Sequence, residues 1–277
     1  MRALITGAVL GGQWRIIRPA LGDEPHSECR VESTDTGVAG RLTLWRTRRA
    51  PTARELERFG HCLAAGGRTG HDAFAPVEDV GYDAARESLW LVRPWWNGES
   101  LPSMLGGLHP VGLDPPYLWA LAEQLARALH TAHEAGWVHG RLRPSRVLVA
   151  PGPQGVRASV LDLGLEHFRR EHARDWLKPP QVGTDALDPA LDEEGPLTPA
   201  PDVFGYGCIL RDMLLTRRDG AWKGCWERWV ERATAPVPRA RFADVREAWD
   251  ALRPVLQSLP DPLPAPPENY QSEPVSV

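Results

Sequence analysis

One histidine and three arginines lie within eight residues of one another in the segment WVHGRLRPSRVLV. The imidazole of His139 can exchange a proton near neutral pH. By contrast, Arg141, Arg143 and Arg146 are permanently charged, and they donate hydrogen bonds without accepting any. Because guanidinium groups match the oxygens of phosphates and carboxylates, the loop carries side chains suited to holding an anion.

The next segment, VLDLGL, adds one carboxylate, Asp162, two residues before Gly164. This carboxylate could bind a cation, or it could be only the turn-forming residue of Asp-Leu-Gly. His130 and His133 lie three residues apart, but no Glu or Cys has metal-ligand spacing to them. The sequence therefore predicts no metal site and no cofactor.

Strands and helices around these two segments must position them. Residues 12–48 predict short strands broken by turns, ARELERFGHCLAAG predicts a helix, and AFAPVEDVGY and ESLWLVRPW predict two further strands. After Asn97 most segments have a helical period, and the two short strands RVLVA and ASVLDL flank a Gly/Pro turn. Residues 165–200, which are rich in proline, predict a long irregular segment.

The composition excludes several classes of protein. The 277 residues carry a net charge of −4, which argues against a dedicated nucleic-acid or membrane-surface binder. No apolar run approaches the roughly 18 residues of a membrane span. The four cysteines have no paired spacing, so we expect reduced thiols and a cytoplasmic location.

The order of these elements and motifs resembles the protein kinase family, and in particular bacterial serine/threonine kinases. WVHGRLRPSRVLV resembles the catalytic loop, usually His-Arg-Asp-Leu-Lys-Pro-x-Asn-Ile-Leu, and VLDLGLEHF resembles the segment that holds Asp-Phe-Gly. WLVRPWWNGESLPSML, PDVFGYGCILRDMLL and PRARFADVREAWDAL resemble three further landmarks. The resemblance implies a bilobal α+β fold, with a β-rich small lobe with one helix at 1–96, a mainly helical large lobe at 97–257, and a disordered Pro-rich tail at 258–277.

Several matching residues have architectural roles in the family. The resemblance implies that His139 packs against the turn containing Gly164, and that Asp202 accepts backbone N–H bonds from the catalytic loop. Arg241 matches an arginine that pairs with the Glu of an Ala-Pro-Glu motif. Here that motif reads Asp-Pro-Ala at 188–190, so we expect Arg241 to pair elsewhere.

The residues that carry phosphoryl transfer in the family are mostly substituted. Arg141 replaces the Asp that accepts the proton, and Arg146 replaces the Asn that binds magnesium. Trp45 stands at the position of the phosphate-binding lysine, and no lysine precedes Lys178. Among the metal ligands only Asp162 survives. Since a guanidinium neither accepts a proton nor coordinates a cation, we expect a pseudokinase that is not an enzyme.

The expected function is a binding module that scaffolds or regulates a protein partner, with an active kinase or another signalling protein as the candidate. We expect no nucleic-acid or membrane partner, and self-association into a homo-oligomer is left open. The candidate partner-binding residues are Arg141, Arg143, Arg146, Trp222 and Trp226. The arginines could instead form a solvated face or internal salt bridges, and the tryptophans could be buried in the core. The alternative function is an atypical active kinase or a nucleotide-binding enzyme on the same fold.

Overall fold

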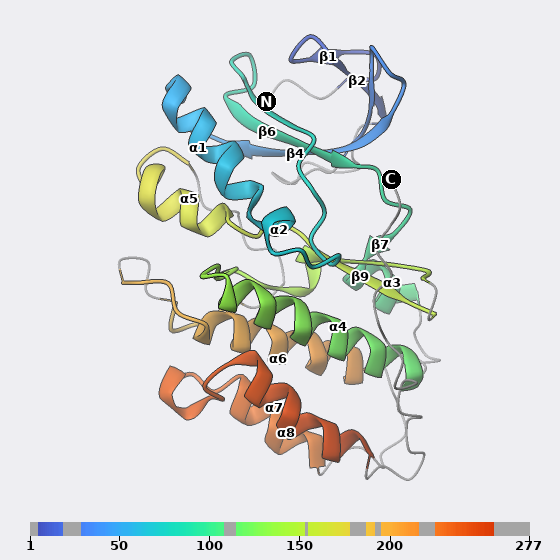
Figure 1. Cartoon of the computed structure of the whole chain (residues 1–277), viewed down its shortest axis with the longest axis vertical. Helices are drawn as coiled ribbons and strands as arrows, with labels where there is room; N and C mark the ends of the chain where they lie inside the picture. Colours follow the sequence, from blue (N-terminus) through green and yellow to red (C-terminus); the bar gives the residue numbers. More distant parts are fainter. Residues whose placement is uncertain are drawn as a thin grey trace.

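The computed structural model shows two lobes, one built around a β-sheet and one mainly helical (Figure 1). It describes residues 5–18, 29–107, 115–152, 155–177, 187–191, 195–215 and 225–257. The candidate residue Trp222 and the tail 258–277 lie outside the described residues, so their predictions stay untested.

The small lobe contains an antiparallel six-stranded sheet with the strand order β1-β2-β3-β4-β6-β5. Its strands are β1 (Val9–Leu10), β2 (Trp14–Arg18), β3 (Cys29–Ser33), β4 (Ala39–Arg46), β5 (Asp79–Asp83) and β6 (Ser88–Pro94). Side chains alternate between the two faces. One face of β4 and β6 carries Leu42, Leu44 and Val92, which pack on β2 and β3, and the other carries Trp45 and Leu91.

Helix α1 (Ala53–Leu63) lies beside the sheet and is followed by the short α2 (Ala65–Arg68). A capping box begins α1: the Glu55 N–H donates to the Thr52 hydroxyl at 3.2 Å, and the Thr52 N–H donates to the Glu55 carboxylate at 2.7 Å. Helix α1 buries Phe59, Cys62 and Leu63. These side chains face the sheet and the later helix α5.

The large lobe combines a three-stranded sheet with a stack of helices (Figure 1). Its strands are β7 (Glu99–Ser100), β8 (Val147–Ala150) and β9 (Arg157–Val160), and its α-helices are α3 (Leu101–Gly107), α4 (Pro115–Glu134), α5 (Leu165–His172), α6 (Ala200–Leu215), α7 (Cys225–Ala233) and α8 (Val245–Gln257). The 3-10 turns η1 (Pro144–Arg146) and η3 (Pro238–Ala240) also lie in the described part of this lobe. Within the described ranges, no helix combines the length and the apolar character that a membrane crossing requires.

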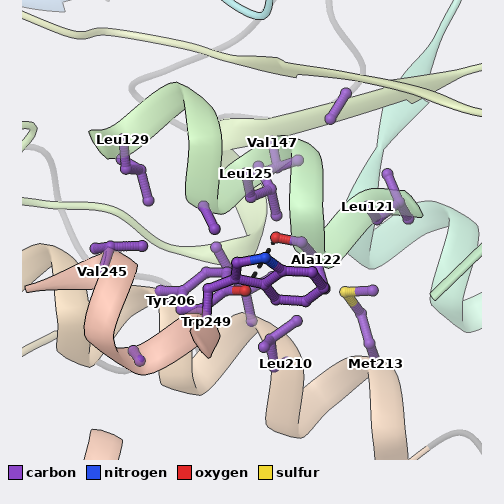
Figure 2. Packing of buried hydrophobic residues seen from close by; sticks show 14 of the residues in the cluster. Leu121, Ala122, Leu125, Leu129, Val147, Tyr206, Leu210, Met213, Val245 and Trp249 are labelled. Carbon is purple, nitrogen blue, oxygen red and sulfur yellow. Dashed lines mark hydrogen bonds between the residues drawn. The ribbon is translucent and has the colours of Figure 1, made fainter. Parts of the chain in front are cut away.

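The core of the large lobe lies where α4, α6 and α8 meet (Figure 2). The apolar stripe of α4, which includes Leu121, Leu125 and Leu129, is fully buried there. The hydroxyl of Tyr206 donates to the backbone carbonyl of Ala122 at 2.9 Å, so the buried phenol is hydrogen-bonded. This rigid core supports the loop between α4 and β8.

The prediction of an irregular segment at residues 165–200 is wrong at its beginning. Residues 165–172 form helix α5, which packs against α1. The helix is stabilised by ion pairs at i,i+3 and i,i+4 spacing. Its arginines and histidines obscured the apolar period on which the prediction relied.

Candidate functional site

The loop after α4 is anchored by Asp202 at the start of α6. The Asp202 carboxylate is fully buried, and it accepts the backbone N–H groups of His139 at 2.8 Å and Gly140 at 2.7 Å. Its Oδ2 also lies 2.8 Å from Nε2 of His133 on α4. A buried carboxylate with these partners holds the loop backbone in one conformation.

His139 connects this loop to the turn that contains Asp162. Its Nδ1 accepts the backbone N–H of Arg141 at 3.3 Å, so Nε2 is the donor to the carbonyl of Leu161 at 2.8 Å. Burial lowers the pKa of His139. The imidazole is therefore a neutral link between loop and turn.

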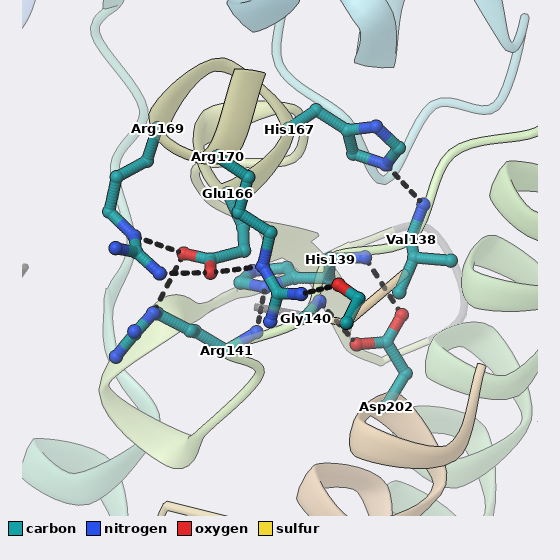
Figure 3. A network of polar contacts seen from close by, with 10 residues as sticks. Val138, His139, Gly140, Arg141, Glu166, His167, Arg169, Arg170 and Asp202 are labelled. Carbon is teal, nitrogen blue, oxygen red and sulfur yellow. Dashed lines mark hydrogen bonds and ion pairs between the residues drawn. The ribbon is translucent and has the colours of Figure 1, made fainter. Parts of the chain in front are cut away.

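Arg141 points to a carboxylate on α5 that was not predicted from the sequence. Its Nε donates to Oε2 of Glu166 at 2.8 Å, and Nε of Arg169 donates to the same oxygen at 2.9 Å (Figure 3). The other oxygen, Oε1, accepts Nη2 of Arg169 at 2.6 Å and Nε of Arg170 at 2.8 Å. Three guanidinium groups thus hold one carboxylate, and we call this set (Arg141, Glu166, Arg169 and Arg170) the Glu166 hub.

The hub is buried, and its electrostatics follow from that burial. The side chain of Glu166 is 2% exposed and that of Arg141 is 10% exposed. Burial raises the pKa of Glu166, but hydrogen bonds from Arg169 and Arg170 and the charge of Arg141 outweigh it and lower the pKa to about 2. Glu166 is therefore ionised at neutral pH.

Asp162 is held between two further arginines. Its Oδ2 lies 3.1 Å from Nη1 of Arg146, and its Oδ1 lies 3.5 Å from Nη1 of Arg93 on β6. All three side chains are at most 6% exposed. Asp162 has a φ of +64°, a conformation that costs free energy for a residue with a side chain.

These residues do not fit a magnesium ion beside Asp162. Magnesium needs oxygen ligands in octahedral geometry, whereas Arg146 and Arg93 place positive charge against both carboxylate oxygens. Across the described part of the chain, no three His, Cys, Asp or Glu side chains are grouped to hold a metal ion.

A small cavity lies between the Glu166 hub and Asp162. Its volume is about 10 Å³, roughly the space of a single water molecule. The lining residues come from the loop, the turn and α5: His139, Arg141, Arg143, Arg146, Asp162, Leu165 and Glu166. The three arginines predicted to bind a partner therefore do share one cavity, but Arg143 and Arg146 are buried, and Arg141 and Arg146 pair with carboxylates of the same chain.

Helix α5 also binds the small lobe, through aromatic contacts. The ring of Phe168 lies 5.2 Å from that of Phe59 and 5.9 Å from that of Trp176, and Phe59 contacts Trp45 at 5.5 Å between ring centroids. The backbone N–H of Arg48 donates to the carbonyl of Trp176 at 2.7 Å. Trp45, the residue at the predicted lysine position, is thus a packing residue with 1% exposure.

Gly164 allows α5 to approach α1 closely. Its φ is +88°, and a β-carbon built on it would lie 2.0 Å from the carbonyl oxygen of Cys62. Only glycine fits this contact without movement of one helix.

The expectation that Arg241 pairs away from the Asp-Pro-Ala segment is wrong. Nη1 and Nη2 of Arg241 each donate to a carboxylate oxygen of Asp188 at 2.6 Å. Asp188 thus makes the pairing that the resemblance assigns to a Glu, although the Asp side chain is shorter.

The interpretation of Trp226 as an interface residue is also corrected. Its side chain is 7% exposed and belongs to the large-lobe core. The same core contains Trp229, whose Nε1 donates to the carbonyl of Ala248 at 2.7 Å. Packing of α7 against α6 and α8 buries the face on which both tryptophans lie.

Glu166 and Arg93, which complete the ion pairs of the loop and the turn, were not among the residues predicted from the sequence. The spacing of Glu166 to Arg169 and Arg170, three and four residues, is a signal of helical ion pairing that could have been found. Arg93 gave no local signal, because its partner Asp162 is 69 residues away.

We predict that acidification destabilises the protein in two steps. Desolvation lowers the pKa values of the buried His139 and the half-buried His167. The unfolded chain therefore takes up protons that the folded chain does not bind as the pH falls below about 6.5. Glu166 keeps its charge until far lower pH. Its contribution to the free energy of unfolding, roughly 3 kcal/mol, is lost as the pH falls from 4.5 towards 2. Urea unfolding at a series of pH values measures both steps.

The variant Glu166→Gln isolates the second step. It should remove the part of the pH dependence between 4.5 and 2 that Glu166 contributes and leave that of Glu55, whose pKa the hydrogen bond from Arg49 also lowers to about 2. Glu247→Gln, at an exposed carboxylate paired with Arg232, should keep both contributions. An unchanged acid limb in Glu166→Gln would contradict the assignment.

The sequence and the fold of the chain are similar to those of several known proteins. No protein-family model matches the chain. The chain is 28% identical over 215 residues to the serine/threonine-protein kinase pkn2 of Myxococcus xanthus, covering 76% of this chain and 25% of that protein. It is 26% identical over 205 residues to the serine/threonine-protein kinase PknA of Mycobacterium tuberculosis, covering 69% of this chain and 45% of that one. The chain thus spans less than half of the length of these relatives.

The kinase domain of Mycobacterium tuberculosis PknI superimposes with a TM-score of 0.68 at 18% identity, covering 91% of this chain and 100% of that chain. The predicted bilobal α+β, protein kinase-like fold is confirmed. The expectation that the chain is not an enzyme is contradicted, because the relatives are named as serine/threonine kinases and the matching structure is a kinase domain. That expectation rested on the residue types at Arg141, Arg146 and Trp45.

Proposed function

We propose that this protein kinase-like chain acts as a regulatory module that binds a protein partner through the arginines of the loop at residues 139–146. The observation that carries the proposal is the cavity lined by Arg141, Arg143 and Arg146 at the junction of the loop, the Asp162 turn and α5. The loop backbone is anchored by Asp202, and the three arginines in the cavity lining are groups that bind anions. The proposal concerns what the site binds, and it does not depend on whether the site also transfers a phosphoryl group.

The partner in this proposal is a signalling protein, with an active kinase as the leading candidate. It carries acidic or phosphorylated side chains, because these are the groups that arginines bind at protein interfaces. A cytoplasmic location belongs to the proposal, and it agrees with the free, buried thiols of Cys29, Cys62 and Cys208.

Phosphoryl transfer is the second candidate function, and the kinases named among the relatives favour it. Asp162 and Glu166 are the carboxylates that line the cavity. Transfer at this site would depend on these two side chains. Both are engaged by arginines in this structure, so those ion pairs would have to open first.

The test of the proposal is capture of the partner, followed by a binding measurement with purified proteins. The double variant Arg141→Gln, Arg146→Gln should weaken binding at least ~10-fold, since each lost charge-assisted hydrogen bond is worth ~1.5–3 kcal/mol. Rising salt should weaken the wild-type complex. The control is Arg232→Gln, which removes an exposed arginine that pairs with Glu247. Normal binding by the double variant would contradict the proposal.

An assay with labelled ATP tests the second candidate. Phosphate incorporation that is lost in Asp162→Asn would assign phosphoryl transfer to this site. Incorporation that is unchanged in Asp162→Asn would place the activity elsewhere.

A further inference from the structure

The Glu166 hub holds one carboxylate of the chain between three arginines. Four hydrogen bonds run from guanidinium nitrogens to the Glu166 carboxylate, at distances of 2.6 to 2.9 Å. Charge-assisted hydrogen bonds of this length are the strong class. The structure therefore shows that these guanidinium groups hold a carboxylate with strong hydrogen bonds.

The three arginines of the hub differ in what they are attached to. Arg169 and Arg170 lie on α5 together with Glu166, so they move with it. Arg141 lies on the loop between α4 and β8, and its bond to Glu166 joins the loop to α5. A movement of α5 away from the loop would therefore separate Glu166 from Arg141, while Glu166 would stay paired with Arg169 and Arg170.

We propose that Glu166 is a built-in competitor for Arg141, and that a phosphorylated side chain of the protein partner replaces it there. The inference rests on the proposed function and names the chemical class that the site recognises. A phosphate monoester has three acceptor oxygens and nearly two charges at neutral pH, so it can bind Arg141 and the neighbouring loop arginines, whereas the Glu166 carboxylate binds Arg141 of the loop together with Arg169 and Arg170 of its own helix. The volume of the cavity is about 10 Å³, which is room for one water molecule and not for a phosphate group. The phosphate therefore binds in the space that the Glu166 carboxylate leaves.

Departure of Glu166 has a structural consequence for α5. The other contacts of the helix with the loop include the bond from the N–H of Val138 to Nε2 of His167, at 3.1 Å (Figure 3). On the opposite side, Phe168 packs between Phe59 of α1 and Trp176. Replacement of Glu166 at Arg141 thus loosens α5 at the loop while its aromatic side stays in contact with the small lobe.

Two variants that break the same ion pair distinguish this proposal from a purely structural role. The probes are a phosphoserine peptide and tripolyphosphate, titrated against the full chain at constant ionic strength. Glu166→Gln removes the competitor and should tighten probe binding ~10-fold or more, whereas Arg141→Gln removes the receptor and should weaken it by a similar factor. The charge control is Glu171→Gln, at a 63% exposed carboxylate on the same helix.

Hydrogen exchange supplies a measurement that needs no variant. Saturation of the wild-type protein with the phosphoserine peptide should speed exchange in α5 at residues 165–172, although bound ligands usually slow exchange. Tighter binding of tripolyphosphate than of the peptide would point to a free phosphate compound as the ligand and overturn the assignment to a protein side chain.

Three outcomes would overturn the proposal altogether. These are changes of the same sign in Arg141→Gln and Glu166→Gln, an effect of Glu166→Gln no larger than that of Glu171→Gln, and absence of probe binding to Glu166→Gln. Failure here is distinguishable from failure of the proposed function. A captured partner that depends on Arg141 but is indifferent to Glu166→Gln would keep the binding role and remove the competitor.

Discussion

Replacement of Arg241 with alanine is expected to lower the free energy of unfolding by about 3–5 kcal/mol. The guanidinium makes two 2.6 Å bonds to Asp188, and the two side chains are 0% and 3% exposed. It also donates to the carbonyls of Ala235 at 2.7 Å and Ala200 at 3.0 Å. Alanine leaves the Asp188 carboxylate buried without its cation, and this uncompensated charge is the main cost. Urea unfolding at pH 7 measures the loss.

The double variant Arg241→Met, Asp188→Leu provides the control. Because it removes both charges, it should be more stable than Arg241→Ala. A matched surface variant, Arg232→Ala, breaks an ion pair whose side chains are 48% and 44% exposed, and it should cost less than about 1 kcal/mol. A loss of the same small size in Arg241→Ala would show that the buried pair does not hold the segment around Asp188 to η3.

The elements that the sequence predicted share a strong apolar period. Helix α4 has one stripe of leucines every three or four residues, and that stripe is the buried one. Strands β4 and β6 are buried on both faces, and their apolar runs marked them as strands. In such segments the local pattern and the tertiary burial agree.

Helix α5 shows where this reasoning fails. Its stability comes from ion pairs of Glu166 with Arg169 and Arg170 and from the burial of Phe168 against α1. The ion pairs leave no apolar period, and the contact with α1 joins residues far apart in the sequence. The proline-rich chain that follows favoured an irregular segment over a helix.

The arginines of the loop were predictable from the sequence, but their ion-pair partners were not. Arg141 and Arg146 were picked out by their place in the loop, yet their partners lie 25 and 16 residues further along the chain. Long-range pairing depends on how α5 and the Asp162 turn fold over the loop, which no local pattern encodes. Burial of the loop arginines is therefore a property of the fold.

The variant Arg141→Glu is expected to destabilise the protein by about 3–5 kcal/mol, because it places a second carboxylate against Glu166 in a buried site. The neutral variant Arg141→Gln should cost less, about 1–3 kcal/mol, since it loses a charge-assisted hydrogen bond without adding a like charge. Adding Glu166→Gln to Arg141→Glu removes the repulsion and should recover part of the loss, a positive coupling that a double-mutant cycle in urea measures. Equal stability of Arg141→Glu and Arg141→Gln would show that the hub is open to solvent and that Glu166 does not repel a carboxylate at position 141.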